Sequence, residues 1–218
     1  MGVGTRRTGD RANGVQPAMS AAAGPAVIVL AAGHGTRMGG PKAFAEHHGR
    51  TFLERILERC RESGARVTLV SDPRFKARME ALLARLPPPF PRVVEADGTR
   101  DMLDSLQAAL RAGPYEPGCW LWPVDAPFIS AAGWRRASEQ AARDPGVIWK
   151  LRVRGRTGHP LWLPSCLGPA ILGGHWPDGL RGFLATVPPE RIQALALDDE
   201  YLDDVDTPQQ LAGLGWLN

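Results

Sequence analysis

Cysteine is scarce in this 218-residue sequence, and its spacing argues against two common structural roles. The three cysteines, Cys60, Cys119 and Cys166, are odd in number and far apart. A disulfide framework or a zinc cluster needs cysteines in pairs or at short, regular spacing. We therefore expect three reduced thiols, as is usual in a cytoplasmic protein.

Long apolar segments are also missing. No run approaches the ~18 residues that a membrane-spanning helix needs, and no signal-like apolar segment precedes the first predicted strand. The net charge is +3, from 26 Lys and Arg against 23 Asp and Glu. No dense basic stripe marks a nucleic-acid surface. We expect neither membrane nor nucleic acid as a partner, whereas a weak positive charge suits small anionic ligands such as phosphates.

The composition is that of an ordinary globular protein, with 44% hydrophobic and 22% charged residues. Residues 1–24 are rich in glycine, alanine and arginine and lack periodicity, so we predict a flexible leader. Residues 25–218 are long enough for one large domain with a substantial core.

Strands and helices are predicted to alternate from residue 26 onward. Short apolar runs predict buried strands, and helical spacing of apolar residues predicts the segments between them. The expected strands are 26–30, 66–70, 93–94, 119–122, 147–153, 161–163 and 192–197. The expected helices are 51–63, 72 to about 86, 101–112, 167–172, 179–187 and 207–213. This order predicts a single α/β domain with a mostly parallel sheet between two helical layers, a Rossmann-like arrangement.

Ligands of such sheets bind outside the carboxyl ends of the strands. The loop that follows Leu30 there contains four glycines and two cations, Arg37 and Lys42. Glycines let backbone amides approach a ligand closely, and successive amides form a concavity that binds anions. A planar guanidinium and a compact ammonium together suit a triphosphate. The alternative is a glycine-rich turn with incidental charges.

Two common phosphate-binding motifs are not present in this loop. A P-loop needs Ser or Thr directly after its lysine, but Ala43 follows Lys42. A dinucleotide fingerprint needs a third glycine three residues after Gly35, where the sequence has Met38. Neither a P-loop NTPase nor a Rossmann dehydrogenase is therefore predicted.

A carboxylate lies at the end of another predicted strand. Asp125 follows residues 119–122 and is flanked by Pro123 and Pro127, which hold it rigidly. Mg²⁺ prefers one or two carboxylates together with phosphate oxygens, so Asp125 is a candidate metal ligand. Its alternative role is a helix N-cap. Near the C-terminus, Asp206 lies in an acidic stretch and is a second candidate metal ligand; the alternative is a solvated acidic turn together with a helix cap.

Residues 30–42, Leu-Ala-Ala-Gly-His-Gly-Thr-Arg-Met-Gly-Gly-Pro-Lys, resemble the signature loop of MobA-like nucleotidyltransferases. That family includes molybdenum cofactor cytidylyltransferases and guanylyltransferases, and its loop wraps the triphosphate. The resemblance implies that Gly33, Gly35 and Arg37 hold phosphates and that Lys42 reaches the α-phosphate. The nucleotide-binding residues it implies within the loop are Ala31, Ala32, Gly33, Gly35, Thr36, Arg37 and Lys42. Family members with Ala-Ala-Gly at the start of this loop, as at residues 31–33, often use CTP or UTP, whereas members with Ala-Gly-Gly more often use guanine nucleotides. The resemblance therefore favours CTP as the nucleotide substrate.

Five further positions match family elements. Asp125 resembles the metal-binding Asp-x-Pro aspartate, and Asp206 resembles the second aspartate of an Asp-x-Asp-Thr-Pro element that returns to the metal. Gly98 and Ser105 resemble a nucleotide-binding helix start, although they are equally explained by a helix cap and core packing. His159 resembles the histidine of a Gly-His-Pro element on the acceptor side, or is a structural histidine.

Together the resemblance implies a nucleotide-diphospho-sugar transferase type of fold and a Mg²⁺-dependent transfer of a nucleoside monophosphate, with CMP favoured. The acceptor would be a small phosphorylated molecule, with a molybdopterin-type cofactor as one candidate, and pyrophosphate would leave. Arg37, Lys42 and Asp125 are the expected catalytic residues, and Asp125 and Asp206 the expected metal ligands. The alternatives are a sugar- or polyol-phosphate acceptor, or a non-catalytic cofactor-binding accessory protein. The hypothesis requires Asp125 and Asp206 to meet in space.

Overall fold

The computed structural model describes residues 24–197 and 204–215, so nearly all of the predicted leader lies outside the described residues. A seven-stranded sheet with the order β5-β4-β1-β6-β8-β7-β9 forms its centre. Its strands are β1 (Ala26–Leu30), β4 (Arg66–Ser71), β5 (Arg92–Glu95), β6 (Gly118–Pro123), β7 (Ile148–Val153), β8 (Arg156–Pro164) and β9 (Ile192–Ala196). All run in one direction except β8, which is antiparallel to both of its neighbours. The predicted mostly parallel sheet is confirmed.

Strand β1 lies in the interior of the sheet, where the elements around it shield it from solvent. It pairs in parallel with β4 on one side and β6 on the other. All five of its residues are buried, as expected for an apolar, β-branched strand with both faces covered. Its carboxyl end therefore delivers the glycine-rich loop from a rigid position.

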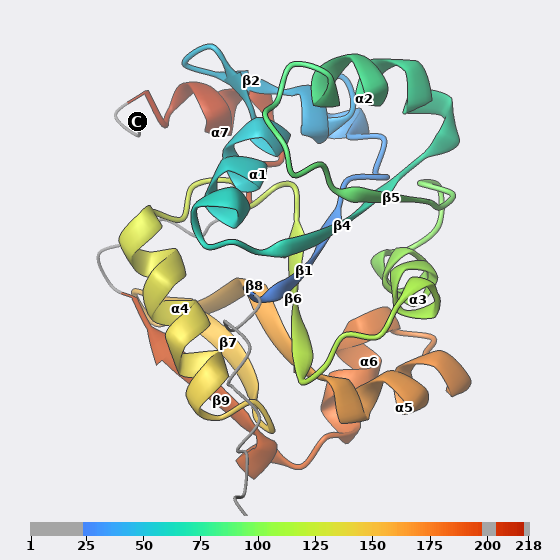
Figure 1. The fold of residues 1–218 in the computed structure, drawn as a ribbon, viewed down its shortest axis with the longest axis vertical. Coiled ribbons are helices and arrows are strands. Elements are labelled where there is room, and N and C mark those ends of the chain that lie inside the picture. Colours follow the sequence, from blue (N-terminus) through green and yellow to red (C-terminus); the bar gives the residue numbers. More distant parts are fainter. Residues whose placement is uncertain (1–23, 198–203, 216–218) are drawn as a thin grey trace, which may run out of the picture.

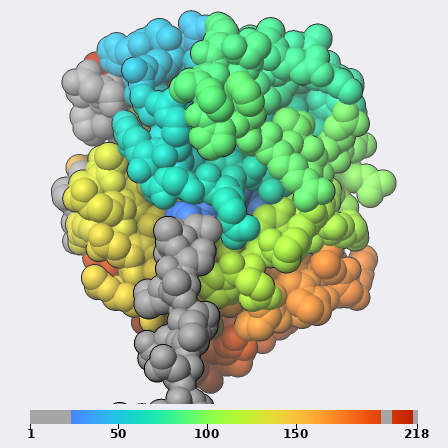
Figure 2. Space-filling model, viewed as in Figure 1, coloured from blue at the N-terminus to red at the C-terminus, as the bar shows by residue number. Residues whose placement is uncertain are grey.

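Helices cover both faces of the sheet (Figure 1). One core packs α1 (Phe52–Glu62), α2 (Lys76–Leu83) and α4 (Ala131–Arg143) against one face. The other core packs α3 (Met102–Ala112), α5 (Gly168–Gly173) and α6 (Gly179–Thr186) against the opposite face. In Figure 2 the atoms of the first strand, coloured blue, are visible only in small areas, because other elements cover them. The three-layer arrangement is confirmed.

The remaining elements are short. Strands β2 (Glu46–His47) and β3 (Arg50–Thr51) pair only with each other, and α7 (Pro208–Ala212) ends the described chain. Single 3₁₀ turns occupy Thr36–Met38, Lys42–Phe44, Pro73–Phe75, Ser165–Leu167 and Pro189–Arg191. Among the described residues, no helix has the length and apolarity needed to cross a bilayer.

Two local features differ from the sequence-based prediction. Helix α4 is not predicted, because its buried face consists of small residues, Ala137 and Ala141, with Trp134 as the only large one. Asp72 caps a 3₁₀ turn at Pro73–Phe75 instead of a continuous helix, and α2 begins only at Lys76. Neither difference alters the carboxyl edge of the sheet, where the candidate residues lie.

Candidate active site

Lys42 joins the two predicted metal-binding acids. Its Nζ donates to Asp125 Oδ2 at 3.0 Å and to Asp206 Oδ1 at 2.5 Å. The Lys42 side chain is 13% exposed, whereas Asp125 and Asp206 are 26% and 27% exposed. The two carboxylates, distant in sequence, therefore meet at one cation and still reach solvent.

The C-terminal segment is held against the rest of the domain by backbone hydrogen bonds and by the buried apolar side chains of Val205 and Leu214. The Val205 amide donates to the carbonyl of Asp125 at 2.9 Å, and the Val205 side chain is fully buried. Thr207 and Gln210 form a capping box that begins α7 directly after Asp206. Farther along, His47 Nε2 donates to the carbonyl of Leu214 at 3.1 Å. This anchoring directs Asp206 towards Lys42.

The glycine-rich loop turns sharply at Gly35. This residue adopts a φ of 58°, and its carbonyl accepts from the amides of Met38 at 2.8 Å and Gly40 at 3.1 Å. A Cβ at Gly35 would lie 2.0 Å from the Gly40 carbonyl oxygen, so only glycine fits. The turn presents Arg37, whose side chain is 71% exposed and donates to Asp206 at 3.1 Å.

Charge pairing controls ionisation at this cluster. Burial opposes the charged form of Lys42, but Asp125 and Asp206 together outweigh it and raise the pKa of Lys42. The hydrogen bond from Lys42, with help from Arg37, lowers the pKa of Asp206 against the effect of burial. Lys42 is therefore a permanent cation and Asp206 a permanent carboxylate at neutral pH, as a polyphosphate and metal site requires.

A cavity of about 290 Å³ opens between this cluster and α3. The predicted residues that line it are Ala32, Gly33, Gly35, Thr36, Arg37, Lys42, Gly98, Ser105 and Asp125. Ala31, also predicted to bind the nucleotide, does not line this cavity, because it is buried and its amide donates to the Val70 carbonyl at 2.8 Å. Arg100 and Met102 also line the cavity, although their sequence context did not single them out. The sequence signal for Arg100 was its position directly before the predicted helix that starts at residue 101.

Gly98 packs directly on the end of β1. A Cβ there would lie 1.8 Å from the Ala32 carbonyl oxygen, which explains why the position needs glycine. The Gly98 amide donates to Asp72 Oδ2 at 2.8 Å, so this amide is already occupied. A contact between Gly98 and a nucleotide would therefore use its Cα or carbonyl.

Asp72, expected only as a helix cap, connects three segments around this cavity. Its buried carboxylate accepts two side-chain hydrogen bonds from Arg74, at 2.9 and 2.6 Å, and lies 3.1 Å from His34 Nε2 in the glycine-rich loop. The bonds from Arg74 do most to lower the pKa of Asp72; burial opposes them, and the Gly98 amide and His34 add to them.

Asp72→Ala is expected to lower the free energy of unfolding at pH 7 by about 2–4 kcal/mol, because it removes a cap and leaves the partly buried amides of Arg74 and Gly98 without their acceptor. Asp72→Asn should cost less at pH 7. Because the folded pKa is depressed, the contribution of the carboxylate is present above about pH 4 and shrinks as pH falls further. Urea unfolding between pH 7 and 3 measures both effects.

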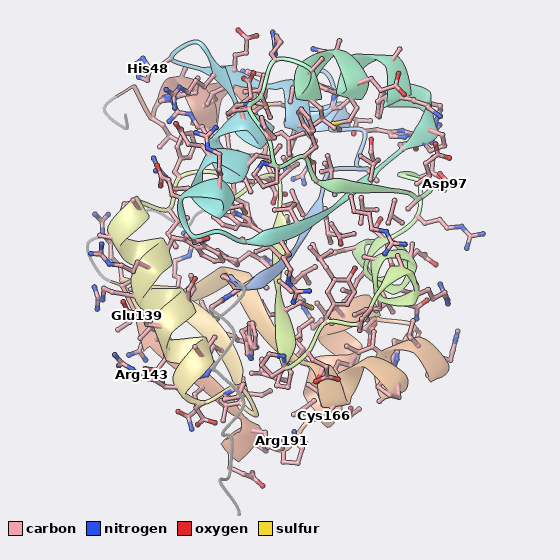
Figure 3. All side chains as sticks on the ribbon, in the orientation of Figure 1. His48, Asp97, Glu139, Arg143, Cys166 and Arg191 are labelled. Carbon is pink, nitrogen blue, oxygen red and sulfur yellow. The ribbon has the colours of Figure 1, made fainter. Side chains whose placement is uncertain are left out.

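Glu139→Gln provides the control for this experiment. Glu139 lies on the outer side of α4 beside Arg143, 3.7 Å away (Figure 3). An exposed pair of this kind contributes ~0.5 kcal/mol or less. An Asp72→Ala protein as stable as Glu139→Gln would show that the Asp72 network does not hold these segments.

His159 lines a second, larger cavity of about 720 Å³ between β8 and α6. It is half-buried, and desolvation lowers its pKa, opposed by Asp125 and assisted by Lys150. The histidine is therefore neutral at pH 7 and lies within electrostatic reach of the acid cluster. The two cavities share Asp101 and Met102, at the start of α3.

The cysteines lie away from this site, and all three are free, as expected. Cys60 and Cys119 are buried, and burial raises the pKa of the Cys119 thiol to about 12. Cys166 is exposed, and it lies with Arg191 at the end of the molecule opposite His48 (Figure 3). None of these thiols is placed for nucleophilic catalysis beside Lys42.

A family model for the MobA-like NTP transferase domain matches residues 27–193. Among curated proteins, the molybdenum cofactor guanylyltransferase of Pseudomonas aeruginosa is 31% identical over 85% of this chain and 92% of its own length. Two longer curated relatives are matched only in part. The match covers 30% of an 8-amino-7-oxononanoate synthase from Chromohalobacter salexigens, at 30% identity over 50% of this chain. It covers 27% of the bifunctional protein GlmU from Paramagnetospirillum magneticum, at 33% identity over 56% of this chain. The chain thus spans less than a third of each of these two.

Solved structures share the fold along most of the chain. Rv0371c from Mycobacterium tuberculosis superimposes with a TM-score of 0.73 at 25% identity, covering 89% of this chain and all of that one. A complex of the same mycobacterial protein with manganese gives a TM-score of 0.67 at 24% identity, covering 88% and 97% of the two chains. Nucleotidyltransferases of lower identity show the same nucleotide-diphospho-sugar transferase fold.

Proposed function

Because the chain belongs to the MobA-like NTP transferase family, we propose that it transfers a nucleoside monophosphate from a nucleoside triphosphate to a small phosphorylated acceptor. The single observation that carries this proposal is the contact of Lys42 with both Asp125 and Asp206 beside a glycine-lined cavity. A polyphosphate site needs fixed cations and amides, and a metal-assisted transfer needs acids beside them.

The donor set fits a hard divalent cation. Asp125 and Asp206 offer carboxylate oxygens that are partly exposed, which matches the preference of Mg²⁺ for one or two carboxylates completed by substrate phosphates. Within the described part of the chain, no group of three or more His, Cys, Asp or Glu side chains lies close enough to hold a metal alone. A bound Mg²⁺ would neutralise phosphate charge. The manganese complex of the mycobacterial relative supports a divalent ion of this kind.

The residues of the chain have separable roles in the proposed transfer. Amides and glycines at positions 33–35, together with Arg37 and Lys42, hold the triphosphate. An acceptor phosphate oxygen attacks the α-phosphorus in line, a new P–O bond forms, and the bond to pyrophosphate breaks. Because that oxygen is already ionised, the reaction needs no general base and no covalent enzyme intermediate. The protein acts by positioning and by neutralising repulsion between two anionic substrates.

Different observations support the proposed nucleotide and the proposed acceptor. The Ala31-Ala32-Gly33 sequence supports CTP, and the Pseudomonas guanylyltransferase supports GTP as the alternative. A molybdopterin-type acceptor is supported by the same relative, whose similarity extends over 92% of its length. Sugar and polyol phosphates are the competing acceptors.

Pyrophosphate release tests this function directly. The protein is incubated with CTP, GTP or UTP and Mg²⁺ or Mn²⁺, with and without molybdopterin cofactor, a sugar phosphate or a polyol phosphate. We expect release only when an acceptor is present, with CTP and the molybdopterin cofactor giving the highest kcat/KM. Nucleotide or cofactor binding without pyrophosphate release, for every combination, would contradict the proposal and identify a non-catalytic binding protein.

A further inference from the structure

The larger cavity holds a lysine where a strand of this kind usually has an apolar residue. Trp149 and Leu151 of β7 face the core on one side of the sheet, and Ile148 faces the core on the other. By strand alternation Lys150 lies on the same face as Ile148, the face that α3 and α6 cover. Its half-buried side chain lines the cavity of about 720 Å³.

Lys150 makes no hydrogen bond and no ion pair with any described residue. A half-buried ammonium that faces a cavity and has no acidic partner is available to bind an anion. The other two lysines of the chain both have acidic partners, Lys42 in the candidate active site and Lys76 with Glu95 at 3.7 Å. The missing partner of Lys150 therefore points to an anion that occupies the cavity.

An irregularity of the sheet lies at this position. Lys150 pairs with Leu161 of β8, but the next residue, Leu151, pairs with Gly158. The two extra β8 residues, His159 and Pro160, form a bulge opposite Lys150. Bulges next to binding sites redirect side chains, and here His159 and Lys150 line the same cavity.

The rest of the lining is amphipathic. Met102, Leu180 and Leu184 provide an apolar wall, and Met102 is 39% exposed. Arg181 lies at the rim and likewise has no hydrogen bond or ion pair with a described residue. Cavities of 300–1,000 Å³ enclose ligands of drug size, so this volume exceeds what a small polyol phosphate fills.

We propose that Lys150 binds the phosphate of the acceptor, and that Met102, Leu180 and Leu184 contact an apolar ring system that carries this phosphate. Arg181 adds positive charge at the entrance. The inference rests on the proposed function, because the cavity adjoins the nucleotide cavity through Asp101 and Met102. It assigns the acceptor to the class of ring-bearing phosphomonoesters and away from small polyol phosphates.

Binding of model phosphomonoesters tests the assignment. The protein is saturated with Mg²⁺ and the α,β-methylene analogue of CTP or GTP, so that the glycine-rich loop is occupied. Dissociation constants are then measured by calorimetry for 1-naphthyl phosphate, 1-naphthol and glycerol 3-phosphate. We expect 1-naphthyl phosphate to bind wild type at least about tenfold more tightly than either of the others, because only it satisfies both the cation and the apolar wall.

Variants locate that binding. Lys150→Gln should weaken 1-naphthyl phosphate at least about tenfold, Lys150→Arg should restore most of the affinity, and Lys76→Gln should leave it unchanged. The dissociation constant of the nucleotide analogue should stay the same in all three variants, and matching thermal melts establish that they fold. Wild-type affinity in Lys150→Gln, or glycerol 3-phosphate bound as tightly as 1-naphthyl phosphate, would overturn the assignment. So would the absence of 1-naphthyl phosphate binding to wild type. Failure of the proposed function differs from these outcomes, because then no nucleotide would yield pyrophosphate with any acceptor.

Discussion

Replacing Lys42 by alanine is expected to lower kcat for nucleotidyl transfer by about 10³-fold or more, with the fold intact. Lys42 is the cation that contacts both acids, and it lines the cavity beneath the glycine-rich loop. Without it, the charge that develops on the transferring phosphate loses a preorganised donor in a partly desolvated site. Single-turnover pyrophosphate release separates this loss from any change in nucleotide binding.

Two comparisons make the Lys42 prediction specific. Lys76→Ala removes a lysine of the same type from an exposed ion pair and should leave kcat unchanged. Lys42→Arg keeps the charge but replaces a compact ammonium by a planar fork, so it should recover only part of the rate. A Lys42→Ala protein that melts like wild type and retains near wild-type turnover would remove Lys42 from the mechanism.

The fold was largely predictable because local sequence and tertiary environment agree. The apolar run of β1 predicts a strand shielded on both faces, and that is where the sheet order places it. Thr51 and Glu54 form the capping box that begins the predicted helix α1. Helix α4 escaped prediction because its buried face is made of glycine and alanine, with Trp134 as its one large apolar residue. The reversed direction of β8 depends on a tight connection from β7, through Arg154 and Gly155 at positive φ, which apolar patterning does not reveal.

The candidate site was predictable in parts. The glycine-rich loop and Asp125 follow strands, and strand ends converge in any parallel sheet. The place of Asp206 depended on family resemblance, because long-range contacts such as the buried Val205 and its bond to the Asp125 carbonyl bring that segment back. The link from Asp72 to Gly98 was not predictable, since it joins residues on different loops.

Asp125→Asn is the second change with a large expected effect, and we expect it to lower kcat by about 10²–10³-fold and to raise the Mg²⁺ concentration needed for half-maximal rate. The substitution keeps the shape of the side chain but removes one of two charged oxygen donors. Lys42 keeps Asp206 as a partner, so the protein should fold normally. Initial rates in a Mg²⁺ titration, after chelation of bound metal, measure both quantities.

The metal dependence of the single and double variants decides whether the two acids hold one cation. Because both acids bond the same Lys42 ammonium, Asp125→Asn with Asp206→Asn should be only slightly slower than either single variant whether the acids hold a cation or only orient Lys42. If they hold the same cation, each variant should raise the Mg²⁺ concentration needed for half-maximal rate. Slower turnover at an unchanged Mg²⁺ requirement in all three variants would contradict a shared metal site and leave the acids as positioning groups for Lys42.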